Sequence, residues 1–413
     1  MHSIRPFSAV CRVSFVPVTL LTALLATTVQ AQPQVLNILL AGQSTIRSDL
    51  RVTAPAELPV MRSLLAGEDV VFTNLEATVA EPGQSVRHGS AFLAPPQALD
   101  VLQVAGINLL ALADNHSYDL GAVGLENTLR EADRRHLVHA GTGDDLQQAA
   151  APAYLHTAHG TVALIASASG ALSPDADATA QHPGLNELHV EAGGHVNEGM
   201  VNLPGNAENV PDKNDAARIL RSIRQARQHA DVVIVYQHNH VFGLQSFGTI
   251  FSEGMAQRLA PNPWVTRWAH AEIDAGADIV VMHGAPLLHG IEIYHRRPIF
   301  YDLGNFIYNL SPTTTFIEEP MVWESVVAHV RFERGILRSI DLQPIVLNAI
   351  GEGQPEVHDR YVNNLFLDTR GLPAPASGSK GFYILQRLAA LSRPFGTTLR
   401  IEGDHAQVQL PRR

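Results

Sequence analysis

The stretch 111–143 reads ALADNHSYDLGAVGLENTLREADRRHLVHAGTG, and its pattern indicates the fold of the whole chain. A short apolar run ends in Asp114-Asn115-His116, a helical pattern follows, and a second short run leads into a glycine turn. Strand, polar turn, helix and strand in succession are typical of a layered α/β domain. Such domains place their ligands where strands end, so polar side chains at these points are candidate site residues.

The same alternation extends outward over the first three hundred residues. Runs rich in Val, Ile and Leu occur at 35–41, 70–73, 109–113, 162–166, 232–236 and 279–282. Helical patterns with one apolar face lie between them at 123–134, 216–228 and 264–275. The later runs 292–294, 299–302, 322–332 and 336–342 have helix-poor connections and indicate antiparallel strands. We therefore expect mixed sheets.

Two segments lack a clear period. Residues 171–212 are rich in Ala, Asp, Gly, Pro and Asn and predict a long surface excursion, which is either a lid or a loop without function. Residues 351–380 predict a linker between a main domain at 32–350 and a closing helix and hairpin that end the chain. The closing unit is too small to bury a core of its own, so we expect it to pack on the main domain.

The first 31 residues have the layout of a cleavable signal peptide. Arg5 and Arg12 precede an apolar run at 13–29, no acidic residue is present, and Ala31 ends a small-residue cleavage site. The alternative is a membrane anchor, but Pro17 interrupts the run, which is shorter than the roughly 20 residues a spanning helix needs. We expect a periplasmic or secreted protein that begins at Gln32.

Composition excludes some partners and some chemistry. The chain has 29 basic and 40 acidic residues; without Arg5 and Arg12, 27 face 40 and the net charge is −13. Such an acidic chain is a poor partner for nucleic acid. The only cysteine, Cys11, lies in the predicted signal, so the exported chain would have neither disulfides nor thiolate ligands. The 20 histidines are then the main chemical lead.

Five polar clusters directly follow apolar runs. They are Gly42-Gln43-Ser44, Asn74-Leu75-Glu76, Asp114-Asn115-His116 with Asp119, His238-Asn239-His240, and His283. Imidazole, carboxylate and amide groups that arrive together suit a divalent ion such as Zn, Mn or Fe.

Each residue also has a plain structural alternative. Asn74 and Asn115 suit turns after strands, and a single histidine usually binds nothing. Asp119 suits the start of a helix, and Glu76 suits a solvated strand edge.

The motifs around these clusters resemble one protein family. The segments 72–79 (FTNLEATV), 233–240 (VIVYQHNH) and 276–309 (GADIVVMHGAPLLHGIEIYHRRPIFYDLGNFIYN), together with 111–143, are similar in content and order to segments of the CapA family of capsule and poly-γ-glutamate synthesis proteins. That family resembles the calcineurin-type metallophosphoesterases. The resemblance implies a four-layer α/β/β/α sandwich with mixed sheets.

The resemblance also implies roles by position. The metal would be held by Glu76, Asn115, His238 and His283. The catalytic groups would be Glu76, His240 and His116, the last of which would stabilise a leaving or bridging oxygen. Substrate-contacting or supporting groups would be Gln43, Asn74, Asp119 and Asn305.

This sequence departs from the family pattern at two places. Gln43 stands where many relatives have the aspartate of a Gly-Asp pair, and an amide is a poorer partner for a dication than a carboxylate. The late His-Pro-His motif is reduced to His283-Gly284-Ala285-Pro286. We therefore expect one divalent ion (Mn, Zn or Fe) rather than a two-metal site.

Three functions agree with this pattern. The first is a metal-dependent hydrolase or transferase that acts on a phosphoester or on an acidic or amide-linked cell-envelope polymer or small molecule. The second is a non-catalytic factor that binds polymer for assembly or export with capsule-synthesis partners at the membrane. The third is a metal-free peptide-modifying enzyme in which His and Glu side chains act as acid and base.

Overall fold

The computed structural model describes residues 35–85, 91–170, 172–192, 195–196, 209–241, 259–309, 320–347 and 371–411. These residues belong to one compact unit. The predicted signal peptide at 1–31 lies outside the described residues. None of the helices that the structure describes is long and apolar enough to cross a membrane.

The first of two large sheets combines parallel and antiparallel pairs. Its order is β23 (Leu399–Glu402), β24 (His405–Val408), β21 (Ile336–Leu347), β20 (Glu324–Glu333), β1 (Val35–Leu40), β3 (Val70–Asn74), β6 (Leu109–Ala111) and β7 (Val138–Ala140), with β22 (Pro373–Pro375) beside β21. Strands β1, β3, β6 and β7 run parallel, whereas β20, β21 and β24 pair antiparallel.

The second sheet is also mixed. Its order is β17 (Ile291–Tyr294), β18 (Arg297–Phe300), β16 (Ile279–His283), β15 (Val232–Asn239), β10 (Gly160–Ser169) and β9 (Ala153–Thr157). Strands β10, β15, β16 and β18 are parallel, and β9 and β17 close the edges antiparallel.

Alternating side chains divide the interior into three cores. On β1, Ile38 and Leu40 face the second sheet, whereas Leu39 faces the helices α2 (Leu58–Leu64) and α3 (Gln97–Ala105). On the second sheet, Ile234 faces inward and Val235 packs against α6 (Lys213–Arg227) and α8 (Pro263–Ala275). Successive side chains of a strand point to opposite faces, so each sheet is buried on both sides.

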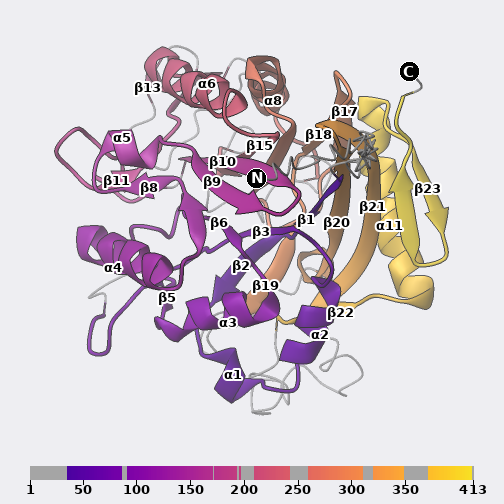
Figure 1. Ribbon diagram of the computed structural model, residues 1–413, viewed down its shortest axis with the longest axis horizontal. Coiled ribbons are helices and arrows are strands. Elements are labelled where there is room, and N and C mark those ends of the chain that lie inside the picture. Colours follow the sequence, from indigo (N-terminus) through magenta and orange to yellow (C-terminus); the bar gives the residue numbers. More distant parts are fainter. Residues whose placement is uncertain are drawn as a thin grey trace, which may run out of the picture. The chain divides into compact units, whose positions relative to one another are not determined.

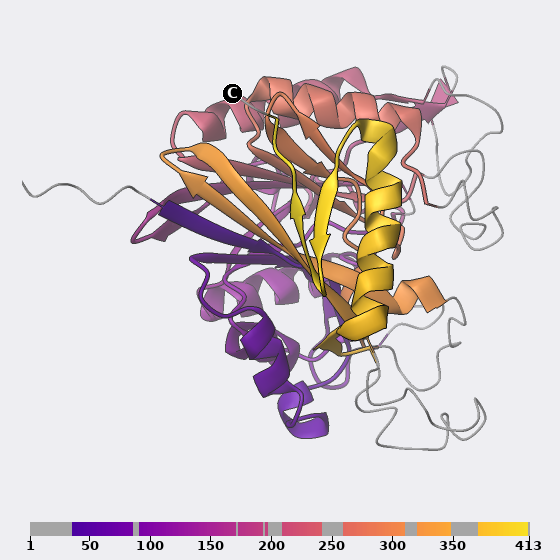
Figure 2. The same ribbon diagram turned by 90° about the vertical axis from the view of Figure 1, so that its right-hand side faces the viewer.

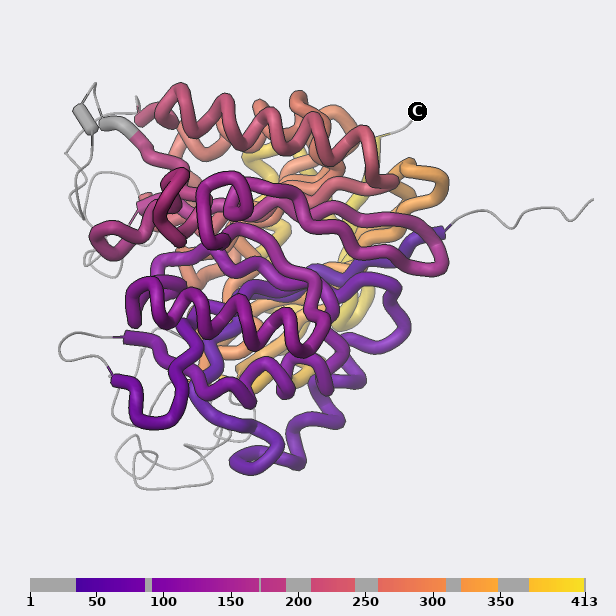
Figure 3. The backbone as a smooth tube through the Cα atoms, turned by 60° about the vertical axis from the view of Figure 1, so that its left-hand side comes forward, coloured from indigo at the N-terminus to yellow at the C-terminus, as the bar shows by residue number. Residues whose placement is uncertain are grey.

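The result is the predicted four-layer α/β/β/α sandwich with mixed sheets. Figure 1 shows α6 and α8 above β9, β10 and β15, with α2 and α3 on the opposite side of the sheets. Figure 3 shows the same order from another side, with α6 along the upper margin and the purple helices of the first third of the chain below.

The remaining elements include α4 and several short strands and turns of helix. They are β2 (Gln43–Ile46), α1 (Leu50–Thr53), β4 (Thr78–Val79), β5 (Leu93–Ala94), α4 (Gly121–Arg134), β8 (Thr142–Gly143), α5 (Leu146–Ala149), β19 (Asn305–Asn309), η2 (Pro320–Trp323) and η3 (Arg393–Phe395). Strand β2 leaves the end of β1 and pairs parallel with β19 rather than continuing the first sheet.

The C-terminal helix α11 (Gly378–Ser392) lies beside the hairpin β23–β24, as Figure 2 shows in yellow. Leu385 and Leu388 of α11 are fully buried in the core between the sheets, and β24 extends the first sheet by pairing with β21. The end of the predicted linker, 371–380, forms β22 and the first turn of α11; residues 351–370 lie outside the described part of the chain.

The predicted excursion at 171–212 contains short strands where its sequence has no clear period. They are β11 (Gly184–Leu185), β12 (Val190–Ala192), β13 (His195–Val196) and β14 (Val210–Pro211). The segment is fastened to α6, because Arg218 Nε donates to Asn186 Oδ1 and His189 Nδ1 hydrogen-bonds Asp215 Oδ2 at 2.6 Å. A lid function for this segment stays a prediction.

Candidate metal centre

At the ends of the central strands, the side chains that face the space between the sheets change from apolar to polar. On β15, Tyr236 faces the core between the sheets, and His238 and His240 follow at intervals of two residues. On β3, Phe72 faces the same core and Asn74 follows it. Since residues two apart point to the same face, the strand ends direct these groups into the space between the two sheets.

Glu76, His238 and His240 come together there. One ligand atom from each lies within 4.8 Å of the others, and all three residues are buried. The Nε2 atom of His238 lies 3.8 Å from Glu76 Oε1 and 2.9 Å from His240 Nε2. One carboxylate and two imidazoles form the three-ligand set with which proteins bind Zn, Mn or Fe while a position stays open.

Two hydroxyl groups orient this triad. Thr45 Oγ1 donates to Glu76 Oε2 at 3.0 Å, and the Tyr236 hydroxyl is hydrogen-bonded to His238 Nδ1 at 3.0 Å. Because these bonds use the outer atom of each side chain, Glu76 Oε1 and His238 Nε2 are left to face each other. Metal-binding carboxylates and histidines are held by outer hydrogen bonds of this kind.

Two further buried carboxyl groups surround Glu76. Burial raises the pKa of Glu76, and it raises the pKa values of Asp114 and Asp302 well above their usual range, with repulsion from Glu76 adding to the last two. No lysine or arginine among the described residues pairs with any of the three. The raised pKa values favour the neutral, protonated carboxyl groups, and a dication among them would favour the charged carboxylates instead, so a divalent cation fits this set of side chains.

The histidines are uncharged at neutral pH. Burial lowers the pKa of His238 well below its usual range and lowers the pKa values of His240 and His283 to about 3. Only neutral imidazole can ligate a metal, so the two histidines of the triad are in the form that binding requires.

His116 lies beside the triad and closer to solvent. Its Nδ1–H donates to Asp119 Oδ2 at 2.7 Å, and its ring stacks on Phe92 with 3.9 Å between centroids. Its positive charge would lower the pKa of Glu76 and of both triad histidines, which places it within electrostatic reach of them. His116 is therefore oriented by a carboxylate, as a histidine that exchanges protons with a substrate must be.

Asp119, which the sequence places near the start of a helix, lies just before α4 and also contacts His116. Helix α4 begins at Gly121, and its capping residue is Leu120, which makes no side-chain cap. Asp119 Oδ2 instead accepts from His116 and, at 2.6 Å, from the backbone N–H of Phe92. The carboxylate thus joins the segment after β6 to the segment before β5.

The remaining predicted site residues surround the triad without joining it. His283 pairs in register with His238 on the neighbouring strand, but its Nδ1–H donates to Asn74 Oδ1 at 3.0 Å and it is not part of the triad. His240, predicted as catalytic, is part of the triad. The ligand role of His283 stays a prediction.

Several buried amide oxygens near the strand ends have no hydrogen-bond partner among the described residues. They are Gln43 Oε1, Asn115 Oδ1 and Asn305 Oδ1. Gln43 and Asn305 are register partners on β2 and β19, and Asn305 Nδ2 donates to Val322 O. Buried polar atoms are rarely left unpaired, and a cation or a bound polar ligand would satisfy these oxygens.

Glycines allow the strand ends to approach one another closely. A Cβ atom on Gly42 would lie 2.3 Å from Gly304 O, and one on Gly284 would lie 2.2 Å from Asn239 O. Gly284 also has a φ of 126°, which side chains disfavour. Both glycines are therefore needed where β1 and β16 end.

The site residues predicted from the sequence did not include Tyr236, Asp302 and Thr45. Tyr236 lies two residues before His238 and so points to the same face, a signal that the alternation contained. Asp302 accepts from the backbone N–H of Gly304, two residues later, and from that of Ala285 in the segment after β16; the second contact leaves no trace in the sequence.

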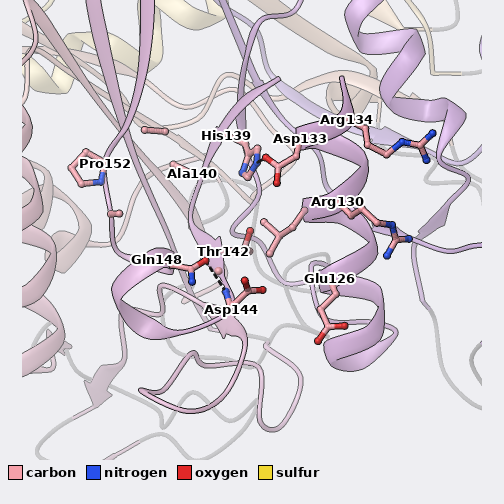
Figure 4. Close-up of a pocket in the computed structure, with 14 residues that line it drawn as sticks. Glu126, Arg130, Asp133, Arg134, His139, Ala140, Thr142, Asp144, Gln148 and Pro152 are labelled. Atoms are coloured by element: carbon pink, nitrogen blue, oxygen red, sulfur yellow. Dashed lines mark hydrogen bonds and ion pairs between the residues drawn. The ribbon is translucent and has the colours of Figure 1, made fainter. Parts of the chain in front are cut away.

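A separate hollow of about 560 Å³ lies between α4 and the segment around α5. Figure 4 shows charged side chains of both signs around it, including Arg130, Asp133 and Asp144. None of the triad residues lines it, so it is distinct from the candidate metal centre.

Several known proteins are similar to this chain in sequence. The family described as bacterial capsule synthesis protein PGA_cap matches residues 38–310. The uncharacterized protein y4sH of Sinorhizobium fredii is 30% identical over 398 residues, which cover 78% of this chain and 80% of that protein. The PGA biosynthesis protein CapA of Bacillus subtilis is 27% identical over 220 residues, covering 53% of this chain and 47% of that protein.

A solved structure described as a novel phosphatase from Mycoplasma pneumoniae aligns with a TM-score of 0.40 and 10% identity. The alignment covers 76% of this chain and 95% of that one.

Proposed function

Because this chain belongs to the PGA_cap family of bacterial capsule synthesis proteins, we propose that it is a metal-dependent hydrolase or transferase of an acidic cell-envelope polymer. The observation that carries the proposal is the triad of Glu76, His238 and His240, with His116 and its partner Asp119 beside it. A relative named for PGA biosynthesis makes an acidic polymer the favoured substrate. We also propose that the chain acts outside the cytoplasm, in keeping with its predicted signal peptide.

Each residue of the site would have a separate role. Glu76, His238 and His240 would hold one divalent cation, which would activate water and polarise the bond to be cleaved. His116, when protonated on both ring nitrogens, would donate its Nε2 proton to the leaving group, and Asp119 would accept from Nδ1–H so that Nε2 faces the substrate. Thr45 and Tyr236 would keep two of the ligand side chains in place.

One contact favours a second function. The 2.9 Å between His238 Nε2 and His240 Nε2 also suits a hydrogen bond from one neutral imidazole to the other. In that arrangement the site would hold no metal, and Glu76 and the histidines would act directly as acid and base. Metal dependence separates this reading from the first.

The test is turnover of poly-γ-glutamate, followed by chain length and by release of new amino groups. The exported protein is freed of metal by chelation, dialysed, and assayed alone and with Mn²⁺, Zn²⁺ or Fe²⁺ added back. We expect cleavage or transfer only after metal is restored, and loss of that activity in His116→Ala with metal still bound. Equal turnover with and without metal would favour the acid–base enzyme, and binding without turnover would favour an assembly factor.

A further inference from the structure

The guanidinium group of Arg47 lies at the edge of the candidate metal centre. Arg47 directly follows β2, and Thr45, two residues earlier, donates to Glu76. Side chains two apart on an extended chain point to the same side, so Arg47 is directed toward the side on which Glu76 lies. Burial lowers the pKa of Arg47, and the negative charge of Asp119 nearby offsets part of that effect.

A stack of planar groups joins Arg47 to the catalytic candidates. Arg47 Cζ lies over the Phe92 ring, 5.2 Å from its centroid, and the same ring stacks on His116 at an interplanar angle of 17°. Arg47, Phe92 and His116 are all half-buried, whereas the triad is buried. The stack is therefore closer to solvent than the triad is.

Most N–H groups of Arg47 have no partner among the described residues. One terminal nitrogen donates to Ala91 O at 2.9 Å. A guanidinium has five N–H donors, and no carboxylate of the described residues forms an ion pair with this one. The nearby Asp119 Oδ2 already accepts from His116 and Phe92. A half-buried cation with unused donors is prepared for an anion from outside the chain.

We propose that Arg47 binds a carboxylate of the polymer unit next to the bond that is cleaved, and so selects acidic over neutral substrates. The inference rests on the proposed function, because it assigns a binding partner to the same site. The planar fork of arginine matches a carboxylate through two parallel hydrogen bonds, and the ring of Phe92 fixes the plane of the fork.

The experiment measures binding rather than turnover. Penta-γ-glutamate and its methyl ester, which has the same backbone without the charge, are titrated calorimetrically into the metal-loaded exported protein. We expect Arg47→Met to weaken binding of the acid by about tenfold or more while leaving binding of the ester unchanged. Arg47→Lys retains the positive charge but loses the forked pair of donors. Its affinity for the acid should lie between that of the wild type and that of Arg47→Met.

Arg51→Met is the matched control, because Arg51 is exposed and already paired with Asp49 and Asp100. It should bind both probes as the wild-type protein does, and melting curves should show all variants folded. Equal affinity of wild type and Arg47→Met for the acid, or no binding of the acid by the wild type, would overturn the inference. Arg47-dependent binding without any hydrolysis would uphold it while rejecting the proposed function.

Discussion

The Nε2 atoms of His238 and His240 lie 2.9 Å apart, and both rings are almost completely shielded from solvent. Both rings are uncharged at neutral pH, because burial lowers the pKa of each imidazole well below neutrality. Two neutral nitrogens this close either share a cation or share a proton. With Glu76 Oε1 3.8 Å from His238 Nε2, we favour the cation.

Gln43→Asp should increase metal affinity or stoichiometry. Gln43 Oε1 is buried without a hydrogen-bond partner among the described residues, and a carboxylate there would attract a dication far better than an amide. Titration with Mn²⁺ or Zn²⁺ measures the effect, with Gln148→Asp, an exposed position outside the site, as the control. If Gln43→Asp binds metal as the wild type does, Gln43 does not face the ion.

Asp119→Asn should reduce turnover roughly 10- to 100-fold while metal content is unchanged. Asp119 orients His116 through a 2.7 Å hydrogen bond and does not touch the triad. Asp133→Asn removes the partner of His139, an Asp–His pair outside the site, and should change neither quantity. Metal loss in Asp119→Asn would show that Asp119 supports the triad instead.

Glu272→Gln should stabilise the protein most at alkaline pH. Glu272 is fully buried on α8, burial raises its pKa to about 8, and the nearby Trp268 indole offsets only part of that rise. Between the unfolded value near 4.5 and pH 8, the folded state retains a proton that the unfolded chain has lost. Wild-type stability should therefore fall by up to about 5 kcal/mol as pH rises across this window.

Urea unfolding at pH 5 and pH 8.5 measures this difference. The glutamine variant should lose much less stability between the two pH values, because it has no proton to release. Parallel pH curves for the two proteins would mean that Glu272 does not titrate abnormally.

Glu324→Ala should destabilise the protein by about 3 kcal/mol. Glu324 is buried at the start of β20, where it accepts from Arg387 and Lys380 of α11, and its loss leaves Arg387 with no carboxylate partner among the described residues. Glu402→Ala breaks an exposed pair with Arg400 and should cost less than about 1 kcal/mol. Similar losses in the two variants would contradict a fastening role for Glu324.

The sequence predicted the layers well because the periods are strong. Strand β15 at Val232–Asn239 contains the predicted run 232–236, and α8 at Pro263–Ala275 contains the predicted helix 264–275. Local apolar pattern decides such elements, and burial on both faces of each sheet preserves it. The polar ends of β3 and β15 follow from the same alternation.

The ligand set was harder to predict. His283 and His240 both follow apolar runs, and only the three-dimensional arrangement shows that Asn74 engages one while Glu76 approaches the other. Arg47 gave no sequence signal, since its partner Phe92 lies 45 residues away and is joined to it only by packing. Contacts between distant segments depend on the complete fold, which periodicity does not encode.

The metal content of the purified protein tests the central claim most directly. Elemental analysis and native mass spectrometry of wild type, His238→Ala and Glu272→Gln, purified side by side without chelators, give ions per chain. We predict one divalent ion in wild type and Glu272→Gln and none in His238→Ala, with all three folded. A wild-type protein that contains no metal, or a His238→Ala variant that retains it, would contradict the account.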